Sequence, residues 1–188
     1  MDWNALVLRA GDPVRAFGRL VRNADGDWFE GPVSVPLIMT PVVRAPTHAV
    51  PLIGASFAGL ADRYEYDGVV EGTAIVTGTW TGSALRVEHQ VPAAQPDQDT
   101  HVFQDRAADA PLPLTRREAE EVRNHLREHW ADWNIYGMGI ISDHVEARLT
   151  RVLPDMAAWM ETLPAGILAL EPWLTPATQR VGAQEPVP

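Results

Sequence analysis

The chain contains no cysteine and no lysine. Without cysteine there can be no disulfide, no thiolate metal ligand and no cysteine nucleophile. The absence of lysine excludes a phosphate-binding P-loop, which requires that residue. All 15 basic residues are therefore arginine, a bias that we attribute to a GC-rich genome rather than to a physical requirement.

Long apolar runs and positive charge are also scarce. No run approaches the roughly 18 apolar residues that span a bilayer. The first residues, MDWNALVLRAGD, lack the basic and apolar regions of a signal peptide. The formal net charge of −10 disfavours binding to nucleic acid or to an anionic membrane. We therefore expect a soluble, cytoplasmic bacterial protein that makes no membrane contact.

Two stretches have the pattern of β-hairpins. Residues 69–88, VVEGTAIVTGTWTGSALRVE, alternate with the period of two of a strand and turn near Gly82. Residues 14–30 repeat this design around the Asp25-Gly26 turn. Glycines within the first arms indicate strands that bend, as at a barrel corner. The sequence thus predicts an α+β protein with a small antiparallel β-barrel, OB-like or SH3-like, or a bent sheet, over residues 1–91.

The composition changes after this region. Residues 92–114 are rich in Pro, Asp and Gln and predict a linker, and residues 175–188 predict a flexible tail. Between them, residues 115–174 predict a helical segment that forms a helical hairpin. This division gives two folded parts joined by the linker.

The helical segment begins with a clear signal. Thr115 and Glu118 fit a capping box, in which side chains satisfy free backbone N–H groups. Apolar residues then recur at steps of three and four, which is typical of an amphipathic helix. The run NIYGMGII (134–141) is interpreted as a break between helices. A second helix is expected over 142–163, with Pro154 either kinking it or beginning a fresh helix.

One motif on the first predicted helix is typical of metal chemistry. His125, Glu128 and His129 fit H-x-x-E-H, which resembles the inverted zinc-peptidase motif. On a helix the two histidines share one face, and the resemblance implies a zinc ion held by them with the glutamate as general base. The alternative is that both histidines flank the apolar stripe at the surface. We favour this alternative and predict no catalytic zinc and no cofactor.

The barrel aromatics allow a second hypothesis. They would form a stacking platform for single-stranded nucleic acid if they were exposed beside arginines. In the alternative, they form the core of the barrel, and the net charge favours this core interpretation. The residues in question are Phe17, Trp28, Phe29 and Trp80, with Arg15, Arg19 and Arg22.

No other catalytic pattern stands out, since no serine lies in a G-x-S-x-G elbow and no glycine-rich phosphate loop is present. The favoured hypothesis is therefore a non-enzymatic interaction or accessory module that binds a protein partner or a second copy of itself. Tryptophan, tyrosine and methionine are enriched at interfaces. We place the expected interface on the outer side of the helical segment, at Trp130, Trp133, Tyr136, Met138, Trp159 and Met160.

Overall fold

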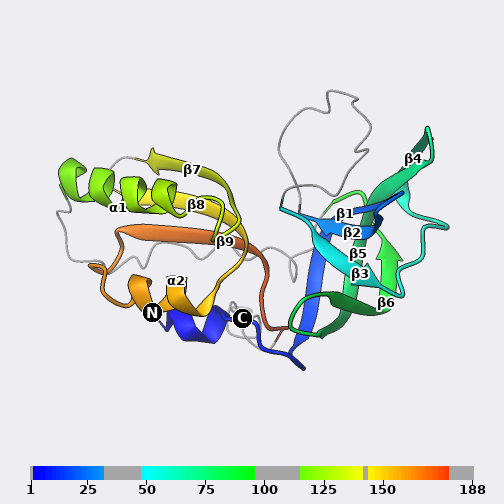
Figure 1. The fold of residues 1–188 in the computed structure, drawn as a ribbon, viewed down its shortest axis with the longest axis horizontal. Coiled ribbons are helices and arrows are strands. Elements are labelled where there is room, and N and C mark those ends of the chain that lie inside the picture. The colour runs from blue at the N-terminus through cyan, green and yellow to red at the C-terminus, as the bar shows by residue number, and fades with distance from the viewer. Residues whose placement is uncertain (1, 32–47, 96–114, 142–143, 178–188) are drawn as a thin grey trace, which may run out of the picture.

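The computed structural model describes residues 2–31, 48–95, 115–141 and 144–177. The chain forms two lobes that lie side by side (Figure 1). Most of the predicted linker and of the predicted tail lies outside the described residues. The barrel lobe contains the strands β1 (Pro13–Asn23), β2 (Gly26–Glu30), β3 (Val50–Ile53), β4 (Ala61–Tyr66), β5 (Val69–Trp80) and β6 (Leu85–Pro92). The small lobe contains α1 (Arg116–Glu128), β7 (Ile135–Ile141), β8 (His144–Arg151), α2 (Pro154–Met160) and β9 (Leu168–Leu174).

The barrel lobe is one strongly bent sheet with the order β1-β2-β3-β6-β5-β4, in which β1 also pairs with β5. Both predicted hairpins are present: β1 pairs with β2, and β5 pairs with β6, in antiparallel register. The ladder shifts between Thr77 and Gly78. A Cβ added at Gly78 would lie 1.9 Å from the carbonyl oxygen of Arg86, so only glycine allows this approach. The α+β class and the bent, barrel-like sheet are confirmed.

The small lobe differs from the predicted helical hairpin. The first helix is present, with the Thr115–Glu118 capping box, but β8 occupies much of the predicted second helix. Val145 and Leu149 fit a helical stripe, yet with Ala147 they also alternate with the period of two of a strand, and all three are buried. Pro154 begins a fresh helix, α2, at one of its first positions. The expected second helix over 142–163 is therefore wrong.

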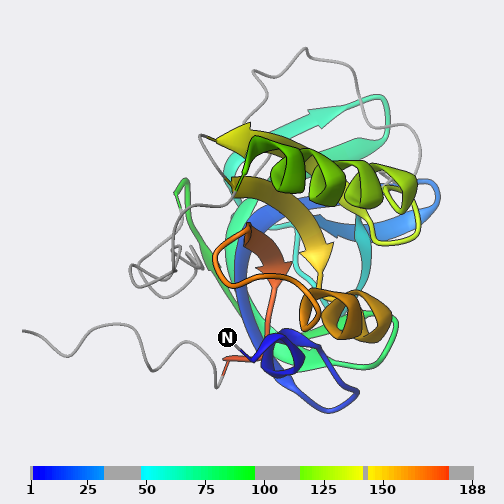
Figure 2. The ribbon, with the colours of Figure 1, turned by 90° about the vertical axis from the view of Figure 1, so that its left-hand side faces the viewer.

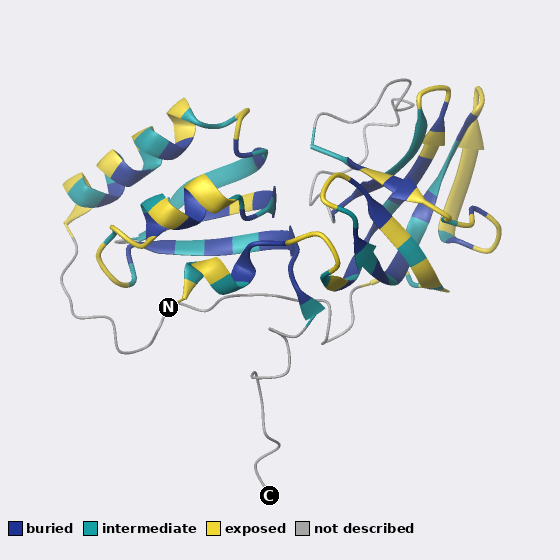
Figure 3. Cartoon of the chain, turned by 60° about the horizontal axis from the view of Figure 1, so that its bottom comes forward, coloured by how far each residue is buried: buried dark blue, intermediate teal, exposed yellow. Residues whose placement is uncertain are grey.

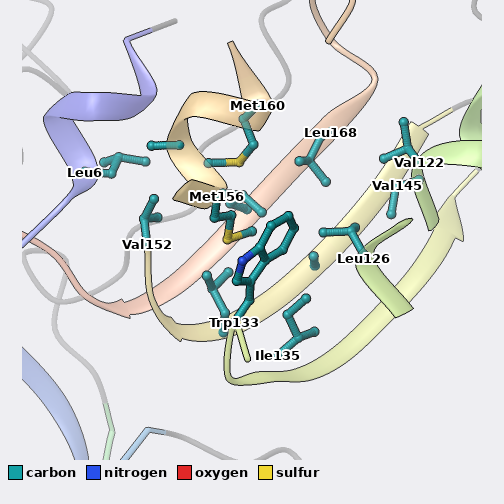
Figure 4. Close-up of a cluster of buried hydrophobic side chains, with 14 of the residues drawn as sticks. Leu6, Val122, Leu126, Trp133, Ile135, Val145, Val152, Met156, Met160 and Leu168 are labelled. Atoms are coloured by element: carbon teal, nitrogen blue, oxygen red, sulfur yellow. The ribbon is translucent and has the colours of Figure 1, made fainter. Parts of the chain in front are cut away.

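The three strands of the small lobe form a sheet with the order β7-β8-β9. β7 and β8 are antiparallel, whereas β8 and β9 are parallel and are connected through α2. Both helices cover the same face of this sheet (Figure 2). Figure 4 shows the resulting core, where Trp133, Met156 and Met160 pack against strand residues such as Leu168. Among the described residues, no helix is long and apolar enough to cross a membrane.

The two lobes are connected by packing as well as by the chain. The N-terminal 3-10 helix (Trp3–Leu6) belongs to the small lobe, and Leu6 is in its core. Conversely, β9 is a strand of the small lobe, but Trp173 and Leu174 at its end belong to the core of the barrel lobe. Arg151 lies over the Trp80 ring at 4.7 Å from its centroid. The chain therefore passes from the small lobe to the barrel and back, and each lobe contributes side chains to the boundary.

Candidate functional site

The H-x-x-E-H residues lie at the end of α1, where they join an aromatic cluster. The rings of His125 and His129 are 4.4 Å apart, as expected for residues one helical turn apart. His125 stacks on Trp159 of α2, and His129 stacks on Trp133, each with a centroid separation of 4.4 Å. Trp133 also donates a hydrogen bond of 2.9 Å from Nε1 to the carboxylate of Asp155. The cluster therefore connects α1 with α2.

The packing of the two histidines bears on whether they can bind a metal ion. His129 Nδ1 lies 3.0 Å from the carbonyl oxygen of His125, so this nitrogen is occupied within the helix. Burial lowers the pKa of His125, and His129 lowers it further, while Glu128 acts in the opposite direction. Within the part of the chain that the structure describes, no group of three or more His, Asp or Glu side chains is placed to hold a metal ion. The geometry is that of a packing seam between two helices.

The six expected interface residues divide into three groups. Trp133 and Met160 are 3% and 1% exposed and lie in the core of the small lobe, so their expected outward placement is wrong. The reason is that a sheet, rather than a second helix, lies under α1 and buries them. Tyr136 packs on Trp173 with a centroid separation of 4.1 Å at the lobe boundary, where burial raises its pKa. The remaining three, Trp130, Met138 and Trp159, are partly buried against the small-lobe core.

The barrel aromatics are mostly interior. Phe17, Phe29 and Trp80 are buried, which agrees with the core interpretation, and only Trp28 keeps intermediate exposure. Two of the three arginines beside them, Arg19 and Arg22, are paired with carboxylates. Arg19 makes ion pairs with Glu30 and Glu71, and Arg22 pairs with Asp27 at 2.7 Å. A stacking platform needs exposed rings beside cations that are available to phosphate, and the burial of Phe17, Phe29 and Trp80 disfavours one here.

Strand edges offer a different kind of site. β4, β7 and β9 each lie at an end of their sheet among the described strands. Proteins protect such edges with charged residues or proline, because unpaired N–H and C=O groups invite pairing with another chain. β4 carries Asp62, Arg63 and Glu65 and is exposed along almost its whole length (Figure 3). β9 carries Pro172 and a glutamate.

β7 has none of this protection. Its sequence, IYGMGII, contains no charged residue and no proline. Ile141, at its end, is a large apolar side chain that is 48% exposed. A seven-residue uncharged edge with an exposed isoleucine is the least protected strand edge of the described chain. The sequence contained this signal, but the two glycines caused the stretch to be interpreted as a break between helices.

Comparison with known proteins adds no family. No family model matches the chain, and neither a curated protein nor a solved structure matches it. Arguments about function therefore rest on the residues and geometry described above.

Proposed function

We propose that this chain is a non-enzymatic protein-interaction module that binds through the outer edge of β7. The observation that carries the proposal is the contrast between this edge and the other two. β4 has charged residues and β9 has a proline and a glutamate, whereas β7 has no charged residue and no proline. An extended segment added to an open edge gains main-chain hydrogen bonds, and the side chains next to it supply specificity.

Residues around β7 support an interface at this place. Met138 and Ile140 pack on the small-lobe core while keeping intermediate exposure, and Ile141, on the opposite face, adds an exposed apolar side chain at the end of the strand. Burying such partly exposed side chains against a partner is favourable by about 25 cal/mol per Å² of apolar surface. The rest of the molecule carries the net charge of −10, so an uncharged strip is the surface on which another acidic protein meets least repulsion.

We further propose that the barrel lobe is OB-like. Its support is the ring of strands formed by the β1–β5 pairing and by the parallel pairing of β3 with β6. A fold of this kind hosts many functions, so it does not by itself indicate nucleic acid. Because Arg19 and Arg22 are paired with carboxylates, the binding role is assigned to the small lobe.

Affinity capture from a lysate of the source organism tests the interaction role. The immobilised wild-type chain is expected to retain a protein, either another copy or a different one. Ile141→Arg should lose most of this retention, since a charge on an edge opposes strand addition. Ile53→Arg is the matched control, because Ile53 is an isoleucine of similar exposure, 45%, in the barrel lobe. Retention that is unchanged by Ile141→Arg, or no retained protein at all, would contradict the proposal.

A further inference from the structure

We propose that the strand added to β7 is β7 of a second copy, paired antiparallel about a two-fold axis that passes between the two Gly139 residues. This inference rests on the proposed function and names its partner. It follows from three observations: the regular segment of the strand, the space around its glycines, and the position of the nearest carboxylates.

The regular part of β7 is self-complementary. Its register with β8 is irregular between Ile135 and Gly137 and continuous from Gly137 to Ile141. Two copies of this five-residue segment, paired about Gly139, place Met138 opposite Ile140 and Gly137 opposite Ile141. Side chains alternate between faces, so Met138 and Ile140 of the two copies fall on the helix-covered face, where both already contact the small-lobe core. Each apolar core thus continues into the other.

Gly137 and Gly139 have open space where a side chain would stand, as far as the described residues show. A Cβ added at Gly139 would meet nothing within 4 Å, and one at Gly137 would meet only the Arg148 side chain at ordinary contact distances. Neither glycine is among those with positive φ. Glycine weakens a strand interior, and it commonly marks a place where another backbone approaches. In the proposed pairing, the exposed Ile141 of one copy lies beside Gly137 of the other and covers the surface that the missing side chain leaves bare.

The carboxylate of β8 adds little repulsion between the copies in this arrangement. The nearest carboxylate on β8 is Glu146, which pairs with Gly139 one strand in from the edge. The two copies of Glu146 are then separated by three strand spacings, or about 14 Å. This distance exceeds the Debye length of about 8 Å at physiological salt, so the two charges are largely screened.

The described parts of the two lobes leave room for the second copy. β7 begins next to the barrel, where Tyr136 packs on Trp173, and runs away from it along the outer side of the small sheet (Figure 1). A two-fold axis at Gly139 therefore sends the second barrel to the opposite end of the assembly. The product is a continuous six-stranded sheet with the order β9-β8-β7-β7-β8-β9, covered by the helices of both copies on one face.

Charge swapping at Gly139 tests the pairing, with sedimentation equilibrium of the purified chains as the measurement. The wild-type chain is expected to be a dimer. Gly139→Glu and Gly139→Lys should each raise the dimer dissociation constant by up to about fivefold, because like charges would stand directly opposite each other. An equimolar mixture of the two variants should recover a heterodimer. An added Cβ meets no described atom within 4 Å, so both variants should keep the wild-type circular dichroism spectrum. Within the monomer Gly139→Glu places a like charge opposite Glu146 and Gly139→Lys does not, so equal spectra for the two variants exclude local unfolding by this pair.

The outcomes separate this inference from the proposed function. A wild-type chain that stays monomeric, or a dimer whose dissociation constant both charge variants leave unchanged, overturns the pairing about Gly139. If the monomeric chain still captures a different protein in a manner sensitive to Ile141→Arg, the interaction role stands and only the identity of the partner is wrong. Tighter association in the Glu/Lys mixture than in either variant alone supports both.

Discussion

At the scale of single residues, the two barrel tryptophans that the sequence analysis treats together have different environments. Trp80 is almost fully buried in the barrel core and lies under Arg151 of the small lobe. Trp28 has intermediate exposure and donates a hydrogen bond of 3.2 Å from Nε1 to the side chain of Asn23. The cost of removing each ring should follow this difference in burial.

Trp80→Ala is expected to lower the free energy of unfolding by about 3–5 kcal/mol, as truncation of large buried aromatic residues does. Trp28→Ala serves as the matched control and should cost clearly less, because its ring leaves a smaller cavity. Urea unfolding followed by circular dichroism measures both. Equal losses for the two variants would show that burial does not govern this part of the barrel.

The aromatic seam between α1 and α2 should make stability depend on pH. The pKa of His125 is lowered in the folded chain, mainly by burial and then by His129, so the folded state holds fewer protons than the unfolded state just below pH 6.5. The stabilisation from neutral His125 is complete above that pH and declines as the pH falls through the folded pKa. Of the acidic groups nearby, Glu128 opposes the shift, while Asp155 of α2 is bonded to Trp133.

The test compares the melting temperatures of the wild type and His125→Gln at pH 7.5 and at pH 5.0. Glutamine stays neutral, so the variant should lose less stability on acidification than the wild type does. An identical loss in the two proteins would mean that His125 does not titrate differently in the folded and unfolded chains.

At the scale of elements, sequence patterns located the start of α1 and both hairpins. They failed at β8, where the same apolar residues fit both a helical and a strand period. The capping box located the start of α1, and Gly–turn patterns located both hairpins, because each depends on residues that are close in sequence. β8 was missed because its apolar residues satisfy a helical stripe and a strand alternation at once. Only the sheet formed with β7 and β9 decides between them, and that is a long-range property.

The missed strand β8 also explains why part of the predicted interface is buried. Trp133 and Met160 lie in the segment where the interface was predicted, but they pack against a sheet that was not predicted and are buried. The uncharged strand at a sheet end is β7, whose glycines gave no helix signal and whose strand character depends on pairing with β8. An edge is a property of sheet order, so a single sequence indicates an uncharged stretch but does not show that it lies at a sheet end.

At the scale of the whole molecule, the chain contains a bent sheet that is covered at one end by a second, smaller unit. Thr150 of β8 donates a hydrogen bond of 2.7 Å from Oγ1 to the carbonyl oxygen of His48, and Trp173 packs closely on Gly31. These contacts position the small lobe on the barrel through β9 and the end of β8. β7 joins them only at its start, where Tyr136 packs on Trp173, and the rest of the strand runs away from the barrel.

The central claim is that the outer edge of β7 pairs with another copy of itself. Amide hydrogen–deuterium exchange over residues 137–141, measured at low and high protein concentration, tests it most directly, because about half of the N–H groups of an edge strand point away from its neighbour. In the wild type, protection of these amides should rise with concentration, whereas in Gly139→Glu it should rise less at the same concentrations. Exchange over 137–141 that is the same at both concentrations in the wild type would contradict the claim.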